Sequence, residues 1–344
     1  MDQWANFADA LIEGRPLNYP AAYALMDEVM GGELGDVRLA SLLSVLAVRG
    51  VTGDELHGLA DAMRDNAREI ALPHRSVDIV GTGGDRANTV NISTMAAIVV
   101  ASLGVPVVKH GNRASTSASG SADVLEALGV NLQLESDRIV AVFESTGIAF
   151  LFANNFHPSM RYAAGTRRAL GFPTVFNVLG PLTNPARPSS AAIGVARAEV
   201  APLVAEVFAK RGDSALVFRG KSVGLDELTT TEESQVWCAS DGEVTYAEFD
   251  PAEAFGLDHS GLEDLQGGDP DFNARVARRV LAGEGGPVAD AVALNAAAGL
   301  VAAKGATGRT VQQDLGEALG RVQDALAEGR PLETLDLWVQ ESRS

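Results

Sequence analysis

The feature that most constrains the fold of this chain is a glycine-rich turn between an apolar segment and an apolar helix. Three of residues 77–80 are apolar, as at the end of a buried strand, and residues 78–85 are Asp-Ile-Val-Gly-Thr-Gly-Gly-Asp. Met95–Leu103 is apolar again, and Gly104 is well placed to end a helix. A strand, a glycine turn and a helix start in this order direct several free backbone N–H groups toward one point. Such an arrangement holds phosphate or pyrophosphate.

The spacing of the glycines narrows the kind of phosphate site. No Gly-Lys-Ser/Thr follows, so the turn is not a P-loop, and the third glycine of the dinucleotide-binding fingerprint is missing. A turn of this kind is often purely structural. Here a polar cluster follows it directly: Asn88, Thr89, Asn91, Ser93 and Thr94. We therefore expect a phosphorylated ligand at this turn.

Composition argues against several classes of partner. The 344 residues are 46% hydrophobic, which suffices for about two domains. The formal net charge of −18 disfavours nonspecific binding to nucleic acid or anionic membranes, since both require a positive field. The single cysteine, Cys238, cannot form an internal disulfide. With neither a signal peptide nor a long uncharged apolar run in the sequence, we expect a cytoplasmic protein without nucleic-acid or membrane partners.

Acidic residues are missing from two long segments that keep their basic residues. Residues 86–122 and 145–198 contain no Asp or Glu, although even scattering of the 45 acids would place about 12 there. The basic residues that remain are Arg86, Lys109, Arg113, Arg161, Arg167, Arg168, Arg187 and Arg197. Burial explains part of the gap, because core segments carry few charges, but it does not explain the basic residues. We expect both segments to fold around one anionic site.

The order of apolar segments predicts an α/β fold, with a mostly parallel central sheet flanked by helices and a small all-helical N-terminal domain. Residues 2–70 have helical periodicity, with a capping box from Thr52 to Glu55. Further strands are expected at 105–108, 148–152, 191–195 and 215–218, a helix from 119–123 to Gly129, another at 288–303 and a last one at 311–326. The expected small domain comprises residues 1–72 with 162–190, and the large one 73–161 with 191–344.

Ligands of such sheets bind beyond the carboxyl ends of the strands, and a basic motif lies there. Lys109-His-Gly-Asn-Arg113 directly follows the expected strand 105–108, so its two charges would neutralise a phosphate. Hydroxyls follow at Ser115, Thr116, Ser117 and Ser121, although a Ser/Thr-rich loop before a helix is ordinary. His110 taken alone is more often a structural histidine than a catalyst.

Two adjacent carboxylates, Asp226 and Glu227, lie on another loop that follows a strand. Carboxylate oxygens suit Mg²⁺, which also keeps water and ligand phosphates in its shell. Taken alone, a solvated acidic turn is the commoner interpretation. A nearby pyrophosphate favours the metal site instead. In a chain of net charge −18, a cation is needed to hold the two carboxylates and the pyrophosphate close together. Residues 156–161 and 166–168 offer a second, Arg-bearing wall, and 176–185 suggests a structural role.

These segments, in this order, resemble the anthranilate phosphoribosyltransferase family over nearly the whole chain. The motifs that carry the resemblance are Gly81-Thr-Gly-Gly-Asp85, Asn91-Ile-Ser-Thr94, Lys109-His-Gly-Asn-Arg113, Ser119 to Gly129, His157-Pro158, Phe176 to Ala186 and Gly224-Leu-Asp-Glu-Leu-Thr-Thr-Thr231. Some positions depart from the family's usual pattern: Ala118, Asn154, Asn155, Lys221 to Val223, Glu232 and Glu233. These departures concern the shape of the anthranilate pocket and the loop dynamics.

The resemblance implies that the amine of anthranilate attacks the anomeric carbon of 5-phosphoribosyl pyrophosphate (PRPP) and displaces pyrophosphate, a step of tryptophan synthesis. It implies that PRPP is held by Gly81, Gly84, Asp85, Thr89, Asn91, Ile92, Ser93, Thr94, Lys109, His110, Gly111, Asn112, Arg113, Ala114, Ser115, Thr116, Ser117 and Ser121. It implies Mg²⁺ at Ser93, Asp226 and Glu227. Anthranilate would meet Gly81, His110, Asn112, His157 and Arg167. A homodimer through the helical domain is also implied.

Three other functions stay open at this point. Pyrimidine nucleoside phosphorylases resemble the chain in fold and in the glycine turn, although their basic motif differs from residues 110–113. A related transferase with another acceptor is equally compatible with the phosphate motifs. A catalytically silent relative that binds nucleic acid is a third alternative, which the acidic balance and the intact Asp226–Glu227 pair oppose.

Overall fold

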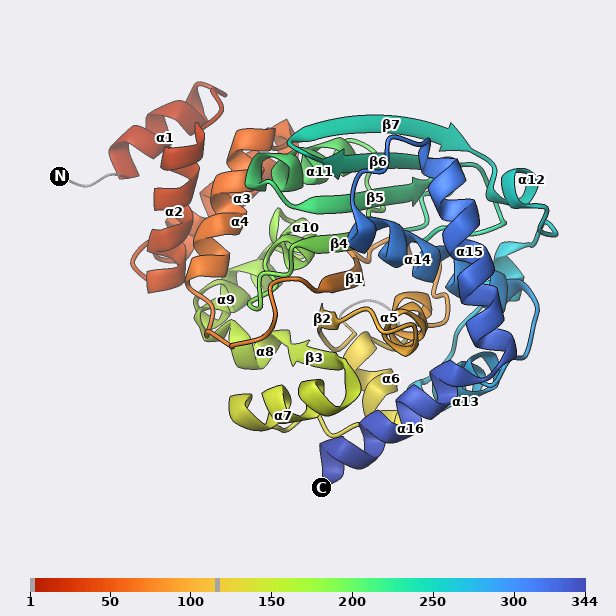
Figure 1. Cartoon of the computed structure of the whole chain (residues 1–344). Helices are drawn as coiled ribbons and strands as arrows, with labels where there is room; N and C mark the ends of the chain where they lie inside the picture. Colours follow the sequence, from red (N-terminus) through yellow and green to blue (C-terminus); the bar gives the residue numbers. More distant parts are fainter. Residues whose placement is uncertain (1–3, 115–117) are drawn as a thin grey trace.

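The computed structural model describes residues 4–114 and 118–344, and its centre is a seven-stranded sheet (Figure 1). The strand order is β3-β2-β1-β4-β5-β6-β7. The strands are β1 (Val77–Gly81), β2 (Val107–Gly111), β3 (Ile148–Phe152), β4 (Ser190–Gly194), β5 (Ser214–Gly220), β6 (Ser234–Ser240) and β7 (Glu243–Phe249). The first five run parallel, and β6 and β7 add antiparallel at one edge. The predicted mostly parallel sheet is thus confirmed.

The helices flank the sheet. They are α1 (Trp4–Ile12), α2 (Tyr19–Gly31), α3 (Asp36–Arg49), α4 (Gly53–Asp65), α5 (Ile92–Ser102), α6 (Ser121–Leu128), α7 (Ser136–Thr146), α8 (Ala153–Phe156), α9 (Arg161–Leu170), α10 (Phe176–Leu179), α11 (Ala201–Arg211), α12 (Pro251–Phe255), α13 (Pro270–Leu281), α14 (Pro287–Lys304), α15 (Val311–Ala327) and α16 (Arg330–Arg343). Short 3₁₀ turns are η1 (Pro158–Met160), η2 (Gly180–Leu182) and η3 (Leu262–Leu265). The helices within residues 4–65 and those at 92–102, 121–128, 287–304 and 311–327 lie close to their expected positions, whereas those at 136–146, 201–211 and 270–281 were not expected. The capping box at Thr52 and Glu55 is present at the start of α4.

Two expectations about local structure were wrong. Strand β2 begins two residues later than predicted and includes Lys109, because Pro106 has no N–H to donate to the ladder. The motif from Lys109 therefore starts inside the strand rather than after it. The helix at 311–326 is not the last one, since α16 follows it after the left-handed Gly329.

The antiparallel hairpin β6–β7 was not expected, although its turn carries a sequence signal. Asp241 and Gly242 both have positive φ, 52° and 80°, as a two-residue hairpin turn requires. The pairing of Ser240 with Glu243 closes this turn. An Asp-Gly pair between two alternating runs is the pattern by which the hairpin could have been found.

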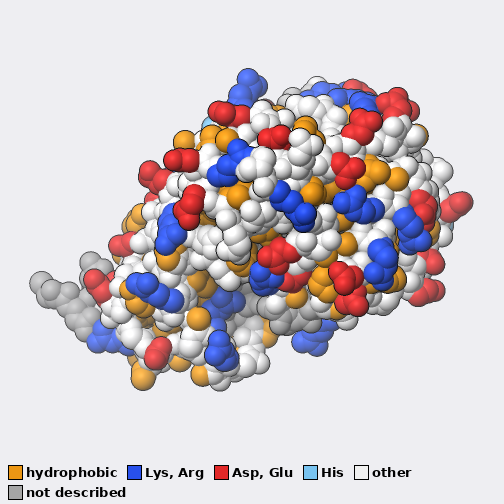
Figure 2. Space-filling model, turned by 90° about the horizontal axis from the view of Figure 1, so that it is seen from below, with side chains coloured by type: hydrophobic (Ala, Val, Ile, Leu, Met, Phe, Trp, Pro, Cys, Tyr) orange, Lys and Arg blue, Asp and Glu red, His pale blue; other side chains and the backbone are white. Residues whose placement is uncertain are grey.

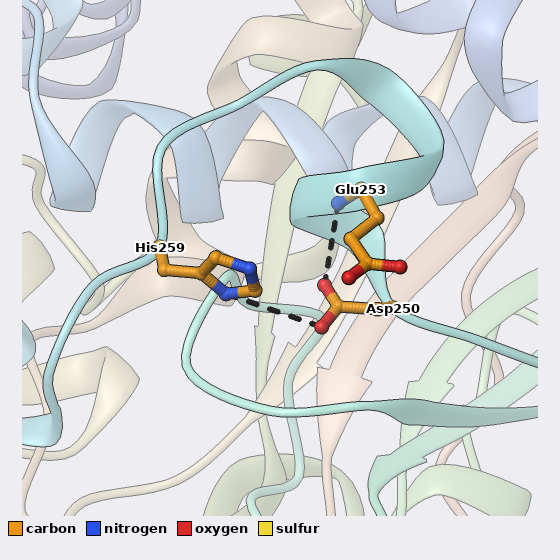
Figure 3. A group of neighbouring side chains, drawn as sticks. All are labelled: Asp250, Glu253 and His259. Carbon is orange, nitrogen blue, oxygen red and sulfur yellow. Dashed lines mark hydrogen bonds and ion pairs between the residues drawn. The ribbon is translucent and has the colours of Figure 1, made fainter.

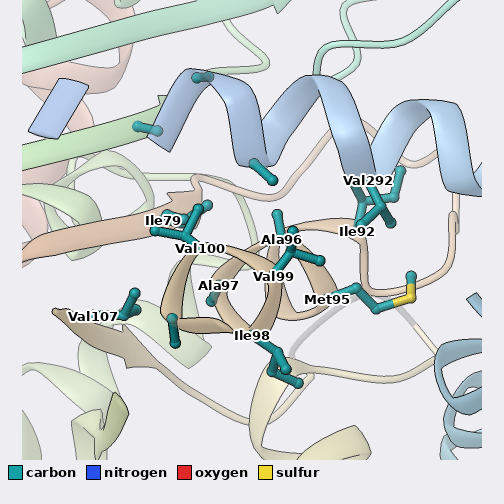
Figure 4. Close-up of a cluster of buried hydrophobic side chains, with 14 of the residues drawn as sticks. Ile79, Ile92, Met95, Ala96, Ala97, Ile98, Val99, Val100, Val107 and Val292 are labelled. Carbon is teal, nitrogen blue, oxygen red and sulfur yellow. The ribbon is translucent and has the colours of Figure 1, made fainter. Parts of the chain in front are cut away.

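The main hydrophobic core lies between α5, α14 and the sheet (Figure 4). Ile92, Ala96 and Val100 of α5 face α14 and β1, and Ile79 of β1 lies between the two helices. Gly299 of α14 allows this closeness, because a Cβ there would meet the Ile79 side chain. Helix α14 has the length and composition of a membrane span, but 67% of it is buried inside the protein. Its contacts with α5, α15 and the strands explain its apolar sequence.

Helices α1–α4 lie together at one side of the molecule, and α9 joins them (Figure 1). Although α9 is distant in sequence, it packs against both α2 and α3. A second apolar cluster covers these helices, α11 and the facing side of β4 and β5. The division into residues 1–72 with 162–190 and 73–161 with 191–344 stays a prediction that this packing supports.

An ion-pair cluster joins α4, one of the N-terminal helices, to α11, which packs against the sheet. Asp61 accepts hydrogen bonds from the Nε and Nη2 atoms of Arg211 at 2.9 and 2.7 Å, and from the hydroxyl of Tyr19 at 2.9 Å. Burial alone would raise the pKa of Asp61, but the hydrogen bond from His57 and the charges of Arg211 and Arg64 outweigh it. They hold that pKa well below its usual range.

We predict that Asp61→Ala destabilises the protein by about 3–5 kcal/mol, because it leaves the buried Arg211 guanidinium without its counter-charge. The matched control is Asp54→Ala, which removes an exposed ion pair with Lys210 between the same two helices. It should cost at most about 1 kcal/mol. Urea unfolding followed by circular dichroism measures both. Equal losses would show that burial of the pair does not determine its contribution.

Candidate active site

The predicted glycine turn meets the loop that carries the paired carboxylates at the carboxyl ends of β1 and β4. Gly81 and Gly194 are paired across these two strands. A Cβ at Gly81 would clash with the Asp226 carboxylate, and a Cβ at Gly194 would overlap the Asp226 carbonyl. The two glycines therefore let the carboxylate loop lie directly on the rim of the sheet. The Gly83 N–H donates to Asp226 Oδ2 at 2.6 Å, which fixes the turn to the loop.

The turn itself presents exposed backbone to the site. Gly83 and Gly84 are exposed and have φ of 66° and 88°, in the left-handed region that favours glycine. Arg86 and Asn88 also have positive φ, 63° and 51°, and these values are uncommon for residues with a side chain. Backbone strain of this kind is often found at binding loops. Asp85 caps the bend by accepting from the Ala87 N–H at 3.1 Å.

Lys109 is the buried cation of the site. Only 1% of it is exposed, and its Nζ donates to the carbonyl of Ile79 and to Ser93 Oγ, the latter at 3.3 Å. Burial lowers the pKa of its ammonium, while the charges of Asp78 and Glu227 oppose that shift. The side chain thus links β2 to β1, to the start of α5 and to the carboxylate loop.

Asp226 and Glu227 are both buried, and each carboxylate has few partners. Burial raises the pKa of Asp226 to about 8, and the neighbouring Asp85 contributes to that rise. Burial, followed by the charge of Asp226, raises the pKa of Glu227 well above its usual range. Among the described residues, Glu227 accepts one hydrogen bond, from the Ser93 N–H at 3.3 Å. Buried carboxylates in this state are stabilised as anions by a cation with oxygen preference.

Asn295 supports the loop that carries Asp226 and Glu227, and it was not predicted from the sequence. It is fully buried on α14, where its Nδ2 donates to the Leu228 carbonyl at 2.8 Å and its Oδ1 accepts from the Leu228 N–H at 3.2 Å. The side chain thus satisfies both backbone groups of the residue after Glu227. A single Asn within an Ala-rich buried helix was the available signal.

Asp78 and Asn184 form a second support that the sequence analysis did not assign to the site. Asp78 accepts from the His110 N–H at 3.2 Å and from Asn184 Nδ2 at 2.8 Å. Asn184 also donates to the Val108 carbonyl at 2.8 Å. Burial raises the pKa of Asp78 to about 6, against the opposing charge of Lys109. The segment 176–185 was expected to be structural. Its Asn184 stabilises the strand that carries Lys109 and His110 through these hydrogen bonds.

The residues before α5 are held by contacts to more distant segments. Asn91 donates to the Ser119 carbonyl at 3.1 Å and accepts from Asn273 of α13 at 2.9 Å. Thr89 pairs with Gln266 as an isolated bridge. Ile92 is fully buried in the core, and Thr94 is buried with a hydroxyl that makes no hydrogen bond to the rest of the described chain. Ile92 therefore packs rather than presenting a polar group.

The loop after β2 is partly described. Gly111 approaches Ser121 and Phe150 so closely that a Cβ would clash, and Ser121 Oγ donates to the Asn112 carbonyl at 3.3 Å. The Ala114 N–H donates to the Asp123 carboxylate at 2.9 Å. The predicted residues Ser115, Thr116 and Ser117 lie outside the described residues.

Arg113 lies in the same loop, and its charge is already compensated. Its guanidinium forms ion pairs with Asp123 at 3.0 Å and Glu126 at 2.6 Å. It also lies over the ring of Phe152, 5.5 Å from the centroid. Two carboxylates around one cation leave Arg113 with little net charge to offer a phosphate.

His110 and His157 form a buried pair beside this loop. Their ring centroids are 5.1 Å apart, and His110 Nδ1 lies 3.2 Å from the Gly180 carbonyl. The Nε2 atoms of both rings are buried and lack a hydrogen-bond partner among residues 4–114 and 118–344. Burial lowers the pKa of His110 to about 3, with a further contribution from His157, and burial lowers the pKa of His157 to about 4. Both rings are therefore neutral near pH 7.

Arg167 of α9 is a half-buried guanidinium without a counter-charge in the described chain. It lies over the ring of Phe176, 5.1 Å from the centroid, and burial lowers its pKa. A carboxylate is the natural complement of such a group. Asn112 lies on the loop after β2 and donates to Asn154 Oδ1 at 3.3 Å.

Another group of potential metal ligands lies outside this site: Asp250, Glu253 and His259 (Figure 3). Their nearest donor atoms lie within 4.8 Å of one another. Asp250 is, however, the N-cap of α12 and accepts from the N–H groups of Ala252 and Glu253. His259 is largely exposed, and its Nδ1 lies 3.9 Å from Asp250 Oδ2. Helix capping on the surface accounts for this geometry.

Comparison with protein families matches almost the whole chain. Residues 73–332 match a glycosyl transferase family, a/b domain, and residues 6–67 match the helical bundle domain of that family. Curated relatives named anthranilate phosphoribosyltransferase include those of Saccharopolyspora erythraea and Arthrobacter sp. They are 50% and 51% identical over 98% and 99% of this chain, and the alignments cover 96% of each relative.

Solved structures give the same result for the fold. Anthranilate phosphoribosyltransferase from Thermus thermophilus superposes with a TM-score of 0.90 at 42% identity, over the full length of both chains. The enzyme from Saccharomyces cerevisiae, solved in complex with PRPP and Mg, has a TM-score of 0.86 at 26% identity. That alignment covers 99% of this chain and 98% of the other.

The histidine pair predicts a loss of stability in mild acid. Each folded-state pKa lies below the unfolded value of 6.5, so the unfolded chain takes up protons first as the pH falls. The contribution of the neutral rings is complete above pH 6.5 and decreases from there toward pH 4, by about 1.4 kcal/mol per unit and ring. We expect His157→Gln to reduce the difference between the urea midpoints at pH 7 and pH 5. The exposed His259→Gln is the control, and an equal change in both variants would contradict the prediction.

Proposed function

This chain belongs to the anthranilate phosphoribosyltransferase family, and we propose that it transfers the 5-phosphoribosyl group of PRPP to the amine of anthranilate. Pyrophosphate leaves, and N-(5-phosphoribosyl)anthranilate forms, as a step of tryptophan biosynthesis. The observation that carries this proposal is the junction of the glycine turn, the buried Lys109 and the Asp226–Glu227 loop at one rim of the sheet. Relatives at about half identity share the name, and one solved relative was obtained with PRPP and Mg.

The reaction requires stabilisation of the leaving group more than a strong base. Departure of pyrophosphate leaves positive charge on the ribose ring and negative charge on the diphosphate. The exposed backbone of Gly83 and Gly84 supports a diphosphate site at the turn. We propose that PRPP is surrounded by Gly81, Gly84, Asp85 and Thr89, by residues Asn91 to Thr94 at the start of α5, and by the segment from Lys109 to Ser117 with Ser121. Within this set, Ile92 packs the core, so its contribution to binding would come from its backbone.

The residues present fit a divalent cation of the Mg²⁺ type. Asp226, Glu227 and the hydroxyl of Ser93 offer hard oxygen donors, and the two buried carboxylates have raised pKa values that a cation would lower. When bound, Mg²⁺ supplies charge neutralisation for the diphosphate and for the two carboxylates.

The acceptor side needs positioning rather than activation. The amine of anthranilate is already a neutral nucleophile, so the protein must hold its carboxylate and exclude water. We propose that Arg167 binds this carboxylate, because its guanidinium is half buried and has no acidic partner in the described chain. Asn112, Gly81 and the neutral pair His110 and His157 would line the same pocket. Because the rings of His110 and His157 are neutral, the charge of Arg167 would be the feature of this pocket that selects a carboxylate.

We further propose a cytoplasmic homodimer that forms through the helical domain. Ile12, Val37 and Val48 of α1 and α3 are apolar and 81–90% exposed, as an interface between two copies would require. On the face shown in Figure 2, basic and acidic side chains are interspersed, without a continuous basic patch. This distribution, with the net charge of −18, supports the expectation that neither nucleic acid nor an anionic membrane is a partner.

The proposal predicts metal-dependent consumption of anthranilate. Protein mixed with PRPP, Mg²⁺ and anthranilate should consume anthranilate, followed by its fluorescence, and EDTA should stop the reaction. Replacement of Asp226 and Glu227 together by Asn and Gln should lower turnover by more than about 100-fold, because the leaving group loses its charge stabilisation. Circular dichroism serves as the control for the fold. Turnover of a nucleoside with phosphate, but not of anthranilate, would assign the chain to the phosphorylases instead.

A second prediction separates the two substrates. Arg167→Ala should raise the KM for anthranilate about 10- to 100-fold, as expected for the loss of a charge-assisted contact, and should change the KM for PRPP much less. The matched control is Arg168→Ala, since Arg168 is the exposed neighbour on the same helix. Equal increases in both KM values would place Arg167 elsewhere in the mechanism.

A further inference from the structure

A cavity lies at the opposite rim of the sheet from the candidate active site. Its volume is about 440 Å³. It is lined by Ser76, which precedes β1, by Ser190, the first residue of β4, and by Pro106, which precedes β2. The glycine turn instead follows the far ends of these strands. Five-residue strands separate the two rims by roughly 15 Å, so the cavity is distinct from the PRPP site.

Two arginines at this cavity have no partner in the described chain. Arg75 comes from the segment before β1 and Arg321 from α15, and both line the cavity. Within residues 4–114 and 118–344, neither side chain forms an ion pair or a hydrogen bond. Most arginines of this acidic chain form such contacts. Arg309, for example, forms an ion pair with Glu317, which lies on α15 as Arg321 does. Both side chains are exposed to solvent, and two unpaired guanidinium groups that line one cavity, those of Arg75 and Arg321, favour an anionic ligand there.

The other charged groups of the cavity largely compensate one another. Lys304 lies 3.9 Å from Asp314 and 3.6 Å from Glu317. Asp314 also accepts from the hydroxyl of Thr307 and lies 3.8 Å from Arg309. The net positive charge that remains therefore belongs to Arg75 and Arg321, which fixes where an anion would be bound.

Apart from Ser76, Ser189 and Ser190, the remaining lining of the cavity is apolar. Val105 and Pro106 come from the segment before β2, and Leu300, Val301 and Ala303 from the end of α14. A free phosphate would leave this surface without a partner. A ligand with an apolar body and one carboxylate would cover it and meet the arginines at the same time. A cavity of about 440 Å³ accommodates such a molecule.

We propose that this cavity is a second ligand site, which binds a small organic carboxylate through Arg75 and Arg321 and its apolar body through Val105, Pro106 and Leu300. The site shares α14 with the active site, because Asn295 on the same helix holds the carboxylate loop. Binding at the cavity does not depend on the activity proposed above, so the two can fail separately.

The test is calorimetric titration of the full chain with 3-phenylpropionate, which carries an aromatic body and a carboxylate. We expect binding, and at least a tenfold weaker affinity in the double variant Arg75→Gln/Arg321→Gln. The double variant should keep its PRPP-dependent consumption of anthranilate. Arg275→Gln, an exposed arginine on α13 away from the cavity, is the matched control and should bind as the unchanged chain does.

Three further titrations distinguish this cavity from the active site and from a simple phosphate site. Arg167→Ala should bind 3-phenylpropionate normally; loss of binding there, but not in the double variant, would place the ligand in the active site and overturn the proposal. Phenethylamine, which has the same ring and a positive charge, should not bind. Inorganic phosphate should bind at least tenfold more weakly. No binding of 3-phenylpropionate at millimolar concentration, or tighter binding of phosphate, would also overturn it.

Discussion

The buried ammonium of Lys109 is the interaction on which the architecture of the site depends. It joins the Ile79 carbonyl of β1, the Ser93 hydroxyl at the start of α5 and the charges of Asp78 and Glu227. A buried cation is costly unless its surroundings compensate it, so these groups must take their positions for the chain to fold. The same requirement assembles the rim of the sheet before any ligand arrives. Folding and preorganisation of the site are thus one event.

Much of the fold could be predicted from the sequence because its signals are local. Ile148–Phe152 was predicted with its observed bounds, since a short apolar run between turn residues has few alternatives. The start of β2 was misplaced because Val105 is as apolar as Val107, and only Pro106 distinguishes them. The hairpin β6–β7 was missed because its strands are half exposed and contain polar residues such as Gln235 and Thr245. Its Asp-Gly turn was the single clear signal.

For the candidate site, too, only part of the residues could be predicted from the sequence. The glycine turn, Lys109 and the Asp226–Glu227 pair could be found because each is a chemical motif within a few residues. The residues that support the site could not be found in this way. Asn295 is 67 residues from the Leu228 backbone that it holds, and Asn184 is 106 residues from Asp78. The neutralisation of Arg113 by Asp123 and Glu126 also depends on how α6 folds back over the loop. Roles that depend on three-dimensional neighbours leave little trace in one sequence.

The contact between Gly194 and the Asp226 carbonyl limits how this protein can be altered. Since even one added methyl group at Gly194 would displace the loop, this position of the strand admits no side chain and cannot be changed to reshape the site. Any attempt to engineer the chain for a bulkier aromatic amine must therefore change residues elsewhere, such as Arg167 of α9, for which we propose a contact with the acceptor carboxylate.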